Sequence, residues 1–575
     1  MRAVLKGSLI SLTLIRLVCG QSGPVISPAS VISAATYAPM GGPNAGLAEG
    51  SFISVYGTNL GPAAPVTAAT LPLQTALSGS SVTITPTAGA PVQAYIDFTS
   101  SGQINAILPS NTPVGPANVT VTYNGATSPP IKINVVASSF GIFTQFYGGG
   151  PAATINTTSG PPYFNLANNS ANPGDVIELY GTGLGPVSSP DNNAPGAVVP
   201  PNVSVQVLLG NQLITPAYAG RSPSLVGVDQ INFTVPSDGS IPASCFVPIA
   251  IIVNGVASNF GTLGVAGTNR ICPPPFGLTT SNLESLENGG TINTGLLNLS
   301  SITREASSGS LTLDQTFQQA GGIFSSQGGL GLLNLEQTLG GVPPVNPAGT
   351  CIVEQINAPV PPTSATPPIM APATELNAGT TLSLSGPGGA TGSLPFSANG
   401  YAAILGQSSL GQPPPTFIKP GVWTMTGPGG SDVGAFTASI TVPTPLTCTN
   451  CSTLSIVNRA QPLTINWTGG GGSQDWVEVA GISTAPLIAD TTKNVAGVFL
   501  CVAHASDQTL TVPANILAQL PPSASSPLAA NPSAIAVINV LGSSNSFTGS
   551  LTAGGNLDLA FFNYSSVLLR VVGFN

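Results

Sequence analysis

The chain has 575 residues, a length that predicts about four domains. Charged residues make up only 5% of it, against roughly 25% in ordinary soluble chains, while 42% of its residues are hydrophobic and Gly (69) and Pro (56) are both abundant. This balance excludes a disordered chain, which would be rich in charge and poor in apolar residues. The 20 acidic residues outnumber 11 basic ones that form no cluster, so we expect no nucleic acid among the partners.

The first 20 residues have the parts of a secretory signal peptide. Arg2 and Lys6 supply the charged start, residues 8–18 the apolar stretch, and a small-residue cleavage site ends at Gly20. Arg16 interrupts the apolar stretch, and a buried N-terminal strand is the alternative interpretation. No later apolar run approaches the roughly 20 residues of a membrane helix. We therefore predict export to the medium or the cell surface, without a membrane span.

A strand pattern near residue 50 returns further along the chain. Residues 50–62 and 174–186 each contain a short strand that runs into a Gly-rich turn closed by Leu-Gly-Pro. In both strands apolar and polar residues alternate, which is the period of a half-buried strand. Because the Gly pattern lacks the third Gly and the following helix of a dinucleotide site, we interpret it as a tight turn and not as a nucleotide loop.

Later landmarks repeat in the same order. Gln-Ile-Asn occurs at 103 and 230, and the hairpin signal Asn-Gly at 124 and 254. The offset between copies grows from 124 to 127 to 130, as loop insertions within a duplicated domain would produce. The sequence therefore predicts two β-sandwich domains, at residues 21–145 and 146–268.

The two copies together resemble a known family. The pattern Tyr-Gly-Thr-x-Leu-Gly-Pro resembles the opening of IPT/TIG immunoglobulin-like domains. The fuller set of motifs is similar to the Solibacter-type domain of secreted acidobacterial proteins, over about residues 30–268. It comprises residues 34–37, 102–105, 140–143, 229–232, 245–248 and 258–259. The resemblance implies a tandem of immunoglobulin-like sandwiches on an exported protein, and it supplies no catalytic residues.

Further β structure is predicted for the rest of the chain. Residues 269–372 are assigned to a β-rich domain that ends in a Pro-rich linker at 358–372, and residues 373–575 to a C-terminal β-sandwich region. A capping-box pattern at 281–284 predicts a short helix that ends at Asn288-Gly289, and residues 513–520 predict two helical turns. The fold class is therefore all-β: tandem immunoglobulin-like sandwiches followed by further sandwich structure.

Six cysteines remain once Cys19 is removed with the signal peptide. In an oxidising compartment an even number favours disulfides, and six cysteines allow 15 pairings. We expect Cys245 to pair with Cys272 and Cys448 with Cys451. The Cys448/Cys451 spacing does not support a zinc site, because a second cysteine pair and a nearby histidine are missing. It does not support redox chemistry either, because it lies between the Pro-containing stretch 442–446 and a predicted strand at 453, and not at a helix N-terminus. No metal or cofactor is predicted.

Three tryptophans are candidates for ligand binding. Trp467 and Trp476 bracket one loop, and with Trp423 they could offer aromatic platforms to a sugar; the alternative is that all three are core residues of a sandwich. His504 is the single histidine, and a hydrolase would need it beside Cys or Ser. The paired amides Gln103/Asn105 and Gln230/Asn232 share a strand face and either bind a partner or satisfy neighbouring polar groups.

These features favour an exported, non-catalytic structural or adhesive protein. We expect its immunoglobulin-like modules to bind an extracellular or cell-surface partner, either a protein or a polysaccharide. The alternative is a carbohydrate-binding protein that uses the tryptophans of the C-terminal region, and a hydrolase is the third possibility.

Overall fold

The computed structural model describes most of residues 23–575. The residues outside the description are 1–22, 39–41, 43, 147, 159–161, 268, 276, 306, 309–310, 313, 329–343, 357–373, 398–399, 409–413, 488–489, 525–532 and 543–544. The signal peptide predicted at 1–20 and the linker predicted at 358–372 lie outside the described residues.

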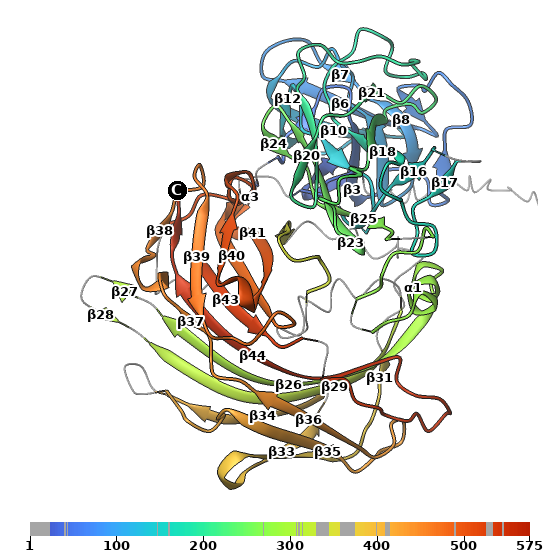
Figure 1. The fold of residues 1–575 in the computed structure, drawn as a ribbon. Helices are drawn as coiled ribbons and strands as arrows, with labels where there is room; N and C mark the ends of the chain where they lie inside the picture. Colours follow the sequence, from blue (N-terminus) through green and yellow to red (C-terminus); the bar gives the residue numbers. More distant parts are fainter. Residues whose placement is uncertain are drawn as a thin grey trace, which may run out of the picture.

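The fold is all-β, with tandem immunoglobulin-like sandwiches followed by a larger β region. Figure 1 shows the two sandwiches, called unit 1 (residues 25–136) and unit 2 (residues 141–265), packed together at one end of the molecule. The C-terminal region (residues 280–574) lies beside unit 2, and its long strands curve away from the pair.

Unit 1 consists of two facing sheets around one core. The first sheet has the order β1-β3-β9-β8-β4 and the second β2-β12-β10-β6-β5, with β7 and β11 attached to the second. Its strands are β1 (Val25–Ser33), β2 (Leu47–Ala48), β3 (Phe52–Thr58), β4 (Val66–Thr67), β5 (Ala76–Leu77), β6 (Ser80–Pro86), β7 (Val92–Gln93), β8 (Tyr95–Thr99), β9 (Gln103–Ile107), β10 (Gly115–Tyr123), β11 (Ala126–Thr127) and β12 (Ile131–Val136).

Unit 2 repeats this topology. Its sheets have the orders β17-β16-β18-β22-β21 and β14-β15-β25-β23-β19-β20, with β13 and β24 attached. Its strands are β13 (Gly141–Ile142), β14 (Thr144–Phe146), β15 (Gly149–Ala152), β16 (Thr154–Asn156), β17 (Tyr163–Phe164), β18 (Val176–Thr182), β19 (Val205–Leu209), β20 (Gln212–Ile214), β21 (Tyr218–Arg221), β22 (Asp229–Thr234), β23 (Ser244–Val253), β24 (Val256–Ala257) and β25 (Gly261–Val265).

Strand register confirms the duplication. Val55 lies opposite Ile104 in unit 1, and Leu179, 124 residues later, lies opposite Ile231 in unit 2. Each unit also contains a parallel contact at the same place: Leu47 of β2 lies opposite Val135 of β12, and Ala171, 124 residues after Leu47, forms a parallel bridge with Val265 of β25. The two Asn-Gly pairs form the predicted hairpin turns, with positive φ at both residues of each pair, as a type I′ turn requires.

The Gly of the repeated Tyr-Gly-Thr motif has a packing role in both units. A Cβ atom on Gly57 would collide with the backbone oxygen of Val25, and one on Gly181 with the backbone oxygen of Gly141. At these points the neighbouring strand approaches too closely for any side chain, so the motif is explained by strand packing.

The boundary between the units lies earlier than predicted. The sequence places it at 145/146, but β13 already pairs with β18, and Phe140 and Ile142 belong to the core of unit 2. The motif at 140–143 therefore opens the second sandwich. It was misplaced because a strand of two residues carries no periodicity.

The C-terminal region is organised around one sheet. In the described residues this sheet has 13 strands, in the order β30-β41-β40-β43-β44-β26-β29-β34-β33-β32-β35-β36, with β31 attached to β29. The helices and strands of the whole C-terminal region are α1 (Thr280–Glu287), β26 (Thr291–Glu305), β27 (Ser307–Ser308), β28 (Leu311–Thr312), β29 (Gln315–Gly328), β30 (Cys351–Ile356), β31 (Thr374–Glu375), β32 (Thr381–Gly386), β33 (Ala390–Ser397), β34 (Gly400–Gln407), β35 (Gly421–Gly427), β36 (Phe436–Val442), β37 (Thr447–Cys448), β38 (Ile456–Val457), β39 (Leu463–Thr468), β40 (Trp476–Leu487), β41 (Asp490–His504), β42 (Thr509–Val512), α3 (Ala514–Leu517), β43 (Ala534–Val540), β44 (Leu559–Val571) and β45 (Gly573–Phe574).

This sheet contradicts the predicted division at 372/373. β26 and β29, from the proposed separate domain, lie in the middle of the sheet, and β26 pairs in parallel with β44, so that Thr294 is opposite Leu559. A parallel pair between such distant segments leaves no local signal in a sequence. Each end of the sheet nonetheless has its own core. One end packs with β37, β39, β42 and α3, and at the other β36 lies over β44.

The two predicted helices are present. α1 begins two residues before the predicted cap: Thr279 is the N-cap, and its hydroxyl accepts a hydrogen bond from the backbone N–H of Asn282 (3.1 Å). Asn288 ends it as predicted. α3 follows Pro513 and is a single turn, shorter than predicted.

Candidate functional site

Two of the three candidate tryptophans are core residues. Trp423 and Trp467 are 0% and 1% exposed. Their indole N–H groups donate to the backbone oxygens of Lys419 and Ala505, each at 2.9 Å. A buried indole whose polar edge is satisfied offers no face to a sugar, so the predicted platform of three rings is wrong for Trp423 and Trp467.

Trp476 is half-buried and contacts His504. The two rings lie 4.5 Å apart between centroids, at 34°, because the residues are directly opposite on β40 and β41. Cys501, the nearby thiol considered as a nucleophile, is bonded to Cys351. The Cys–His version of the hydrolase hypothesis is therefore excluded.

The paired amides satisfy one another. Gln103 donates to the Asn105 side-chain oxygen at 2.8 Å, and Gln230 donates to that of Asn232 at 3.0 Å. Ser54 also donates to Asn105 at 3.0 Å. These contacts run within one sheet, as the structural interpretation of the amides predicts.

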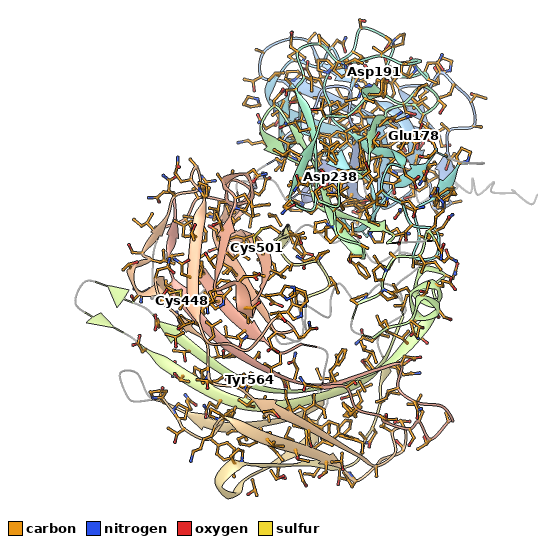
Figure 2. All side chains as sticks on the ribbon, in the orientation of Figure 1. Glu178, Asp191, Asp238, Cys448, Cys501 and Tyr564 are labelled. Carbon is orange, nitrogen blue, oxygen red and sulfur yellow. A yellow bond between two sulfur atoms is a disulfide. The ribbon has the colours of Figure 1, made fainter. Side chains whose placement is uncertain are left out.

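Three disulfides pair the six cysteines that follow Cys19. Cys245–Cys272 and Cys448–Cys451 are the expected pairs, and the third joins Cys351 to Cys501. Figure 2 labels Cys448 and Cys501, which both lie in the C-terminal region. The Cys351–Cys501 bond links directly opposite residues of β30 and β41 and so fixes one edge of the large sheet.

The joint between the two sandwiches holds a buried ion pair that sequence reasoning missed. Arg221 is 2% exposed and contacts the fully buried Asp229, while its other terminal nitrogen donates to the backbone oxygen of Gly185 at 2.9 Å. Asp229 also accepts from the backbone N–H of Leu184 at 2.8 Å. Burial raises the pKa of the Asp229 carboxyl, and the positive charge of Arg221 acts in the opposite direction.

A second carboxylate connects this pair to unit 1. Asp191, labelled in Figure 2, lies 3.8 Å from the Arg221 guanidinium. Its two oxygens accept from the backbone N–H of Ser110 (2.7 Å) and from the Ser110 hydroxyl (2.8 Å). Because Ser110 belongs to the first sandwich, these two hydrogen bonds connect the buried charges of unit 2 to unit 1.

The hairpin between β21 and β22 also reaches unit 1. In unit 1 the equivalent hairpin joins Thr99 to Ile104, five positions apart, whereas in unit 2 the matching pair Ala219 and Ile231 is twelve apart, so unit 2 has seven extra residues. Within them, a Cβ on Gly227 would collide with Ile107 and Phe52 of unit 1. The insertion forms part of the joint.

The joint between unit 2 and the C-terminal region is apolar. Leu208, Ala250 and Ile252 face outward from the second sheet of unit 2 and share one core with Val353 of β30 and Ile516 of α3. As a result β23 is buried on both faces, with Ile249 and Ile251 in the core of unit 2. The continuous apolar run at 246–252 was the available signal for this second contact.

A further ion pair in unit 2 joins Arg270, which follows β25, to Asp175, which directly precedes β18. Arg270 contacts Asp175 and lies over the ring of Tyr163, 5.4 Å from its centroid. Burial opposes ionisation of Asp175, but hydrogen bonds from Arg270, from the backbone N–H of Asn172 (2.8 Å) and from Asn156 outweigh it and hold the pKa of that carboxyl below its ordinary value.

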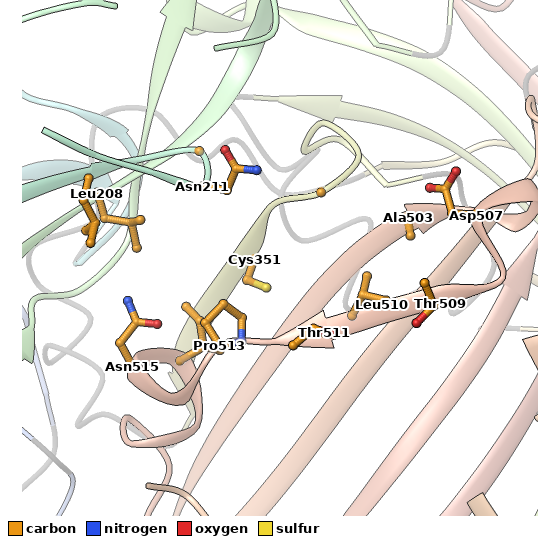
Figure 3. A pocket seen from close by; sticks show the side chains of 14 residues that line it. Leu208, Asn211, Cys351, Ala503, Asp507, Thr509, Leu510, Thr511, Pro513 and Asn515 are labelled. Carbon is orange, nitrogen blue, oxygen red and sulfur yellow. The ribbon is translucent and has the colours of Figure 1, made fainter. Parts of the chain in front are cut away.

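A cavity of about 370 Å³ opens where unit 2 meets the C-terminal region. The β19–β20 turn contributes Asn211, β30 contributes Cys351, and the segment from Asp507 to Ile516 forms the opposite wall (Figure 3). Among the described residues no group of acidic, cysteine or histidine side chains is placed to hold a metal ion. In the same part of the chain no helix is long and apolar enough to cross a membrane.

The comparisons with known proteins give only distant similarities. No protein-family model matches the chain, and no curated protein matches it. Among solved structures, domains 5–6 of the S-layer protein SbsC are 13% identical, with 43% of this chain and 99% of that chain covered and a TM-score of 0.16. The N-terminal four immunoglobulin domains of Dscam1 are 10% identical, with 96% and 100% covered and a TM-score of 0.11. Immunoglobulin domains 1–5 of Sidekick-1 are 10% identical, with 92% and 78% covered and a TM-score of 0.12. The likeness does not extend to a common superposition, and the fold assignment rests on the strand pairing of this chain.

Proposed function

We propose that the chain is an exported, non-catalytic structural or adhesive protein that presents its immunoglobulin-like modules to an extracellular or cell-surface partner. The observation that carries this proposal is the way in which the modules are joined. Buried polar contacts fix unit 1 to unit 2, where Asp191 lies beside Arg221 and accepts hydrogen bonds from Ser110 of unit 1, and a shared apolar core fixes unit 2 to the C-terminal region. Joints of this kind suit a protein that must hold a fixed shape outside the cell.

The disulfides support the extracellular part of the proposal. Three bonds that use every cysteine after Cys19 require an oxidising compartment to form and persist. The low content of charged residues leaves a surface whose charge changes little with pH, which suits an exposed protein.

We also propose that residues 30–268 belong with the Solibacter-type domain and its IPT/TIG-like repeats. The motifs that carry this resemblance occupy equivalent places in the two sandwiches. Tyr56-Gly57 and Tyr180-Gly181 lie in β3 and β18, and the Gln-Ile-Asn motifs lie in β9 and β22.

The test is localisation combined with thiol chemistry. Intact cells that produce the full chain are treated with a membrane-impermeant biotin reagent and fractionated, and the purified protein is labelled with maleimide with and without reductant. We expect surface or extracellular protein that lacks residues 1–20 and takes up maleimide only after reduction. Cytoplasmic protein with free thiols would overturn the proposal.

The adhesive part needs a separate measurement. Beads coated with the mature protein are mixed with intact producer cells and with their extracellular polymer, and beads coated with heat-unfolded protein are the control. We expect retention only by the folded protein. Equal retention by both preparations would leave a purely structural role as the function.

A further inference from the structure

The cavity between unit 2 and the C-terminal region has the composition of a binding site for an uncharged polar molecule. Its volume of about 370 Å³ lies at the small end of the range of roughly 300–1,000 Å³ that is usual for ligand pockets, and domain joints are a common place for them. None of the 14 described residues that line it is basic or aromatic. Phosphate and other anions therefore have no counter-charge here.

The polar groups lie toward the two ends of the cavity. In Figure 3 Asn211 and Asn515 lie toward one end and Asp507 toward the other, with Cys351 between them. Within the described residues the Asn515 side chain and the Asn211 amide nitrogen make no hydrogen bond, and Asp507 uses one oxygen to accept from the backbone N–H of His504 at 3.0 Å. The Asn515 amide, the Asn211 amide nitrogen and one carboxylate oxygen of Asp507 are thus available to a ligand.

Apolar groups form the surface between these ends. Leu510 and Ile516 are buried, and Leu208 approaches from unit 2. The Cys351–Cys501 bond holds β30 against β41 beneath the cavity. A site whose walls are fixed before binding loses less conformational entropy when a ligand is ordered in it.

We infer that this cavity binds a neutral mono- or disaccharide. A sugar hydroxyl both donates and accepts, so one ring can donate to the Asp507 carboxylate, and hydroxyls at the other end can pair with the amides of Asn211 and Asn515. The C–H face of the ring then covers Leu510 and the disulfide. The site is independent of the tryptophans and of the scaffold role proposed above, because a scaffold need not bind a sugar.

The experiment is titration of the full mature protein with glucose, galactose, N-acetylglucosamine and cellobiose, followed by saturation-transfer NMR and calorimetry. At least one of these sugars is expected to bind. Asn211→Ala and Asn515→Ala should each weaken that binding at least about tenfold, because each removes hydrogen bonds made only by the bound ligand. Asp507→Asn should weaken it as well.

Matched controls separate the site from general effects. Asn118→Ala replaces an exposed amide of unit 1, and Asp238→Asn an exposed carboxylate outside the cavity; neither should alter binding. Unchanged thermal midpoints show that the cavity variants are folded. The inference is overturned if none of the four sugars binds or if the cavity variants bind as the wild type does. Surface localisation is read separately, so either proposal can fail alone.

Discussion

The two sandwiches have the same topology and differ on the outer face of one sheet. In unit 1 this face of β6, β10 and β11 carries hydroxyl side chains that are half-buried or exposed. In unit 2 the positions 130 residues later on β23 and β24 carry apolar side chains at 0–8% exposure. The matched pairs are Thr120 and Ala250, Thr122 and Ile252, and Thr127 and Ala257.

This difference separates what folds a sandwich from what docks it. The inward positions are apolar in both copies: Val119 and Val121 face the core of unit 1, and Ile249 and Ile251 face that of unit 2. These positions define the domain. The outward positions decide whether the sheet faces water or the C-terminal region, and burial of a side chain of isoleucine size stabilises a contact by roughly 1.5–3 kcal/mol.

The hairpin that follows β8 in unit 1 and β21 in unit 2 also differs between the copies, because only the hairpin of unit 2 carries residues of the joint between the units. Unit 1 turns from β8 to β9 through Ser101-Gly102, whereas unit 2 opens its longer hairpin with the buried pair Arg221 and Asp229. Unit 2 therefore takes part in both joints, whereas unit 1 takes part in one. Substitutions in unit 2 should disturb the whole molecule, and matched substitutions in unit 1 should not.

The largest effect is expected from the disulfide beneath the docked face of unit 2. Replacing Cys351 and Cys501 by Ser opens a loop of 150 residues. Because the unfolded chain then regains the entropy of that loop, the free energy of unfolding should fall by about 5 kcal/mol. Replacing Cys448 and Cys451, three residues apart, should cost about 2 kcal/mol by the same relation. Denaturant unfolding of both double variants measures the two losses in free energy of unfolding. If the two losses are equal, closing the 150-residue loop adds no stability of its own, and β30 is held in place by packing.

A buried charge without its partner should be the next most costly change. Arg221→Met leaves the buried Asp229 carboxyl without its partner at the joint, and breaking such a pair costs about 3–5 kcal/mol. Asp229→Asn in the same chain should recover part of this loss, because a neutral amide replaces the carboxyl that has lost its partner. Denaturant midpoints of the single and double variants give the coupling. If the single variant is as stable as the double, the ion pair does not hold the joint.

Exchanging one matched residue of the outer faces tests the comparison directly. Ile252→Thr should destabilise the protein by about 2 kcal/mol, because a buried apolar group is lost and a hydroxyl is buried in its place. The reciprocal change Thr122→Ile is expected to alter stability by no more than about 0.5 kcal/mol, since that side chain is only half-buried and its hydroxyl contact with Thr127 is exposed. Thermal unfolding checks both. Similar losses in the two variants would mean that the outer face of unit 1 is also covered.

Much of each sandwich could be predicted because its signals are local. Alternating strands, the two Asn-Gly turns and the repeated motifs each involve fewer than about ten neighbouring residues. The outward docking face was missed although Ala250 and Ile252 make the run continuously apolar, since one sequence does not show what covers a second buried face.

The errors in the rest of the chain have a common cause. The parallel pair of β26 and β44 and the burial of Trp423 and Trp467 depend on segments far apart in the chain. Similarly, Arg221 and Asp229 are eight residues apart in the chain and become partners only because the hairpin of β21 and β22 places them opposite one another. The cavity is lined by three segments that lie far apart in the chain, so the sequence alone does not show that their residues come together.

The smallest expected effect is a pH dependence confined to unit 2. Asp175 and Ser51, 124 residues apart, hold equivalent turns: the backbone N–H of each donates to the residue three before it, Asn172 or Ala48. The pKa of Asp175 is lowered in the folded protein, so its ionisation stabilises the fold above the ordinary carboxyl pKa near 3.8, and this contribution disappears as pH falls through the lower folded value. Asp175→Asn should therefore be less stable than the wild type at neutral pH, and the gap should close below about pH 4. Ser51→Ala removes the hydrogen bond from the Ser51 hydroxyl to the backbone oxygen of Ala48 (2.7 Å), and it should lower stability equally at neutral pH and below about pH 4. Thermal midpoints between pH 2 and 7 decide the matter, because a gap for Asp175→Asn that persists in acid would show that the side chain acts through packing and not through its charge.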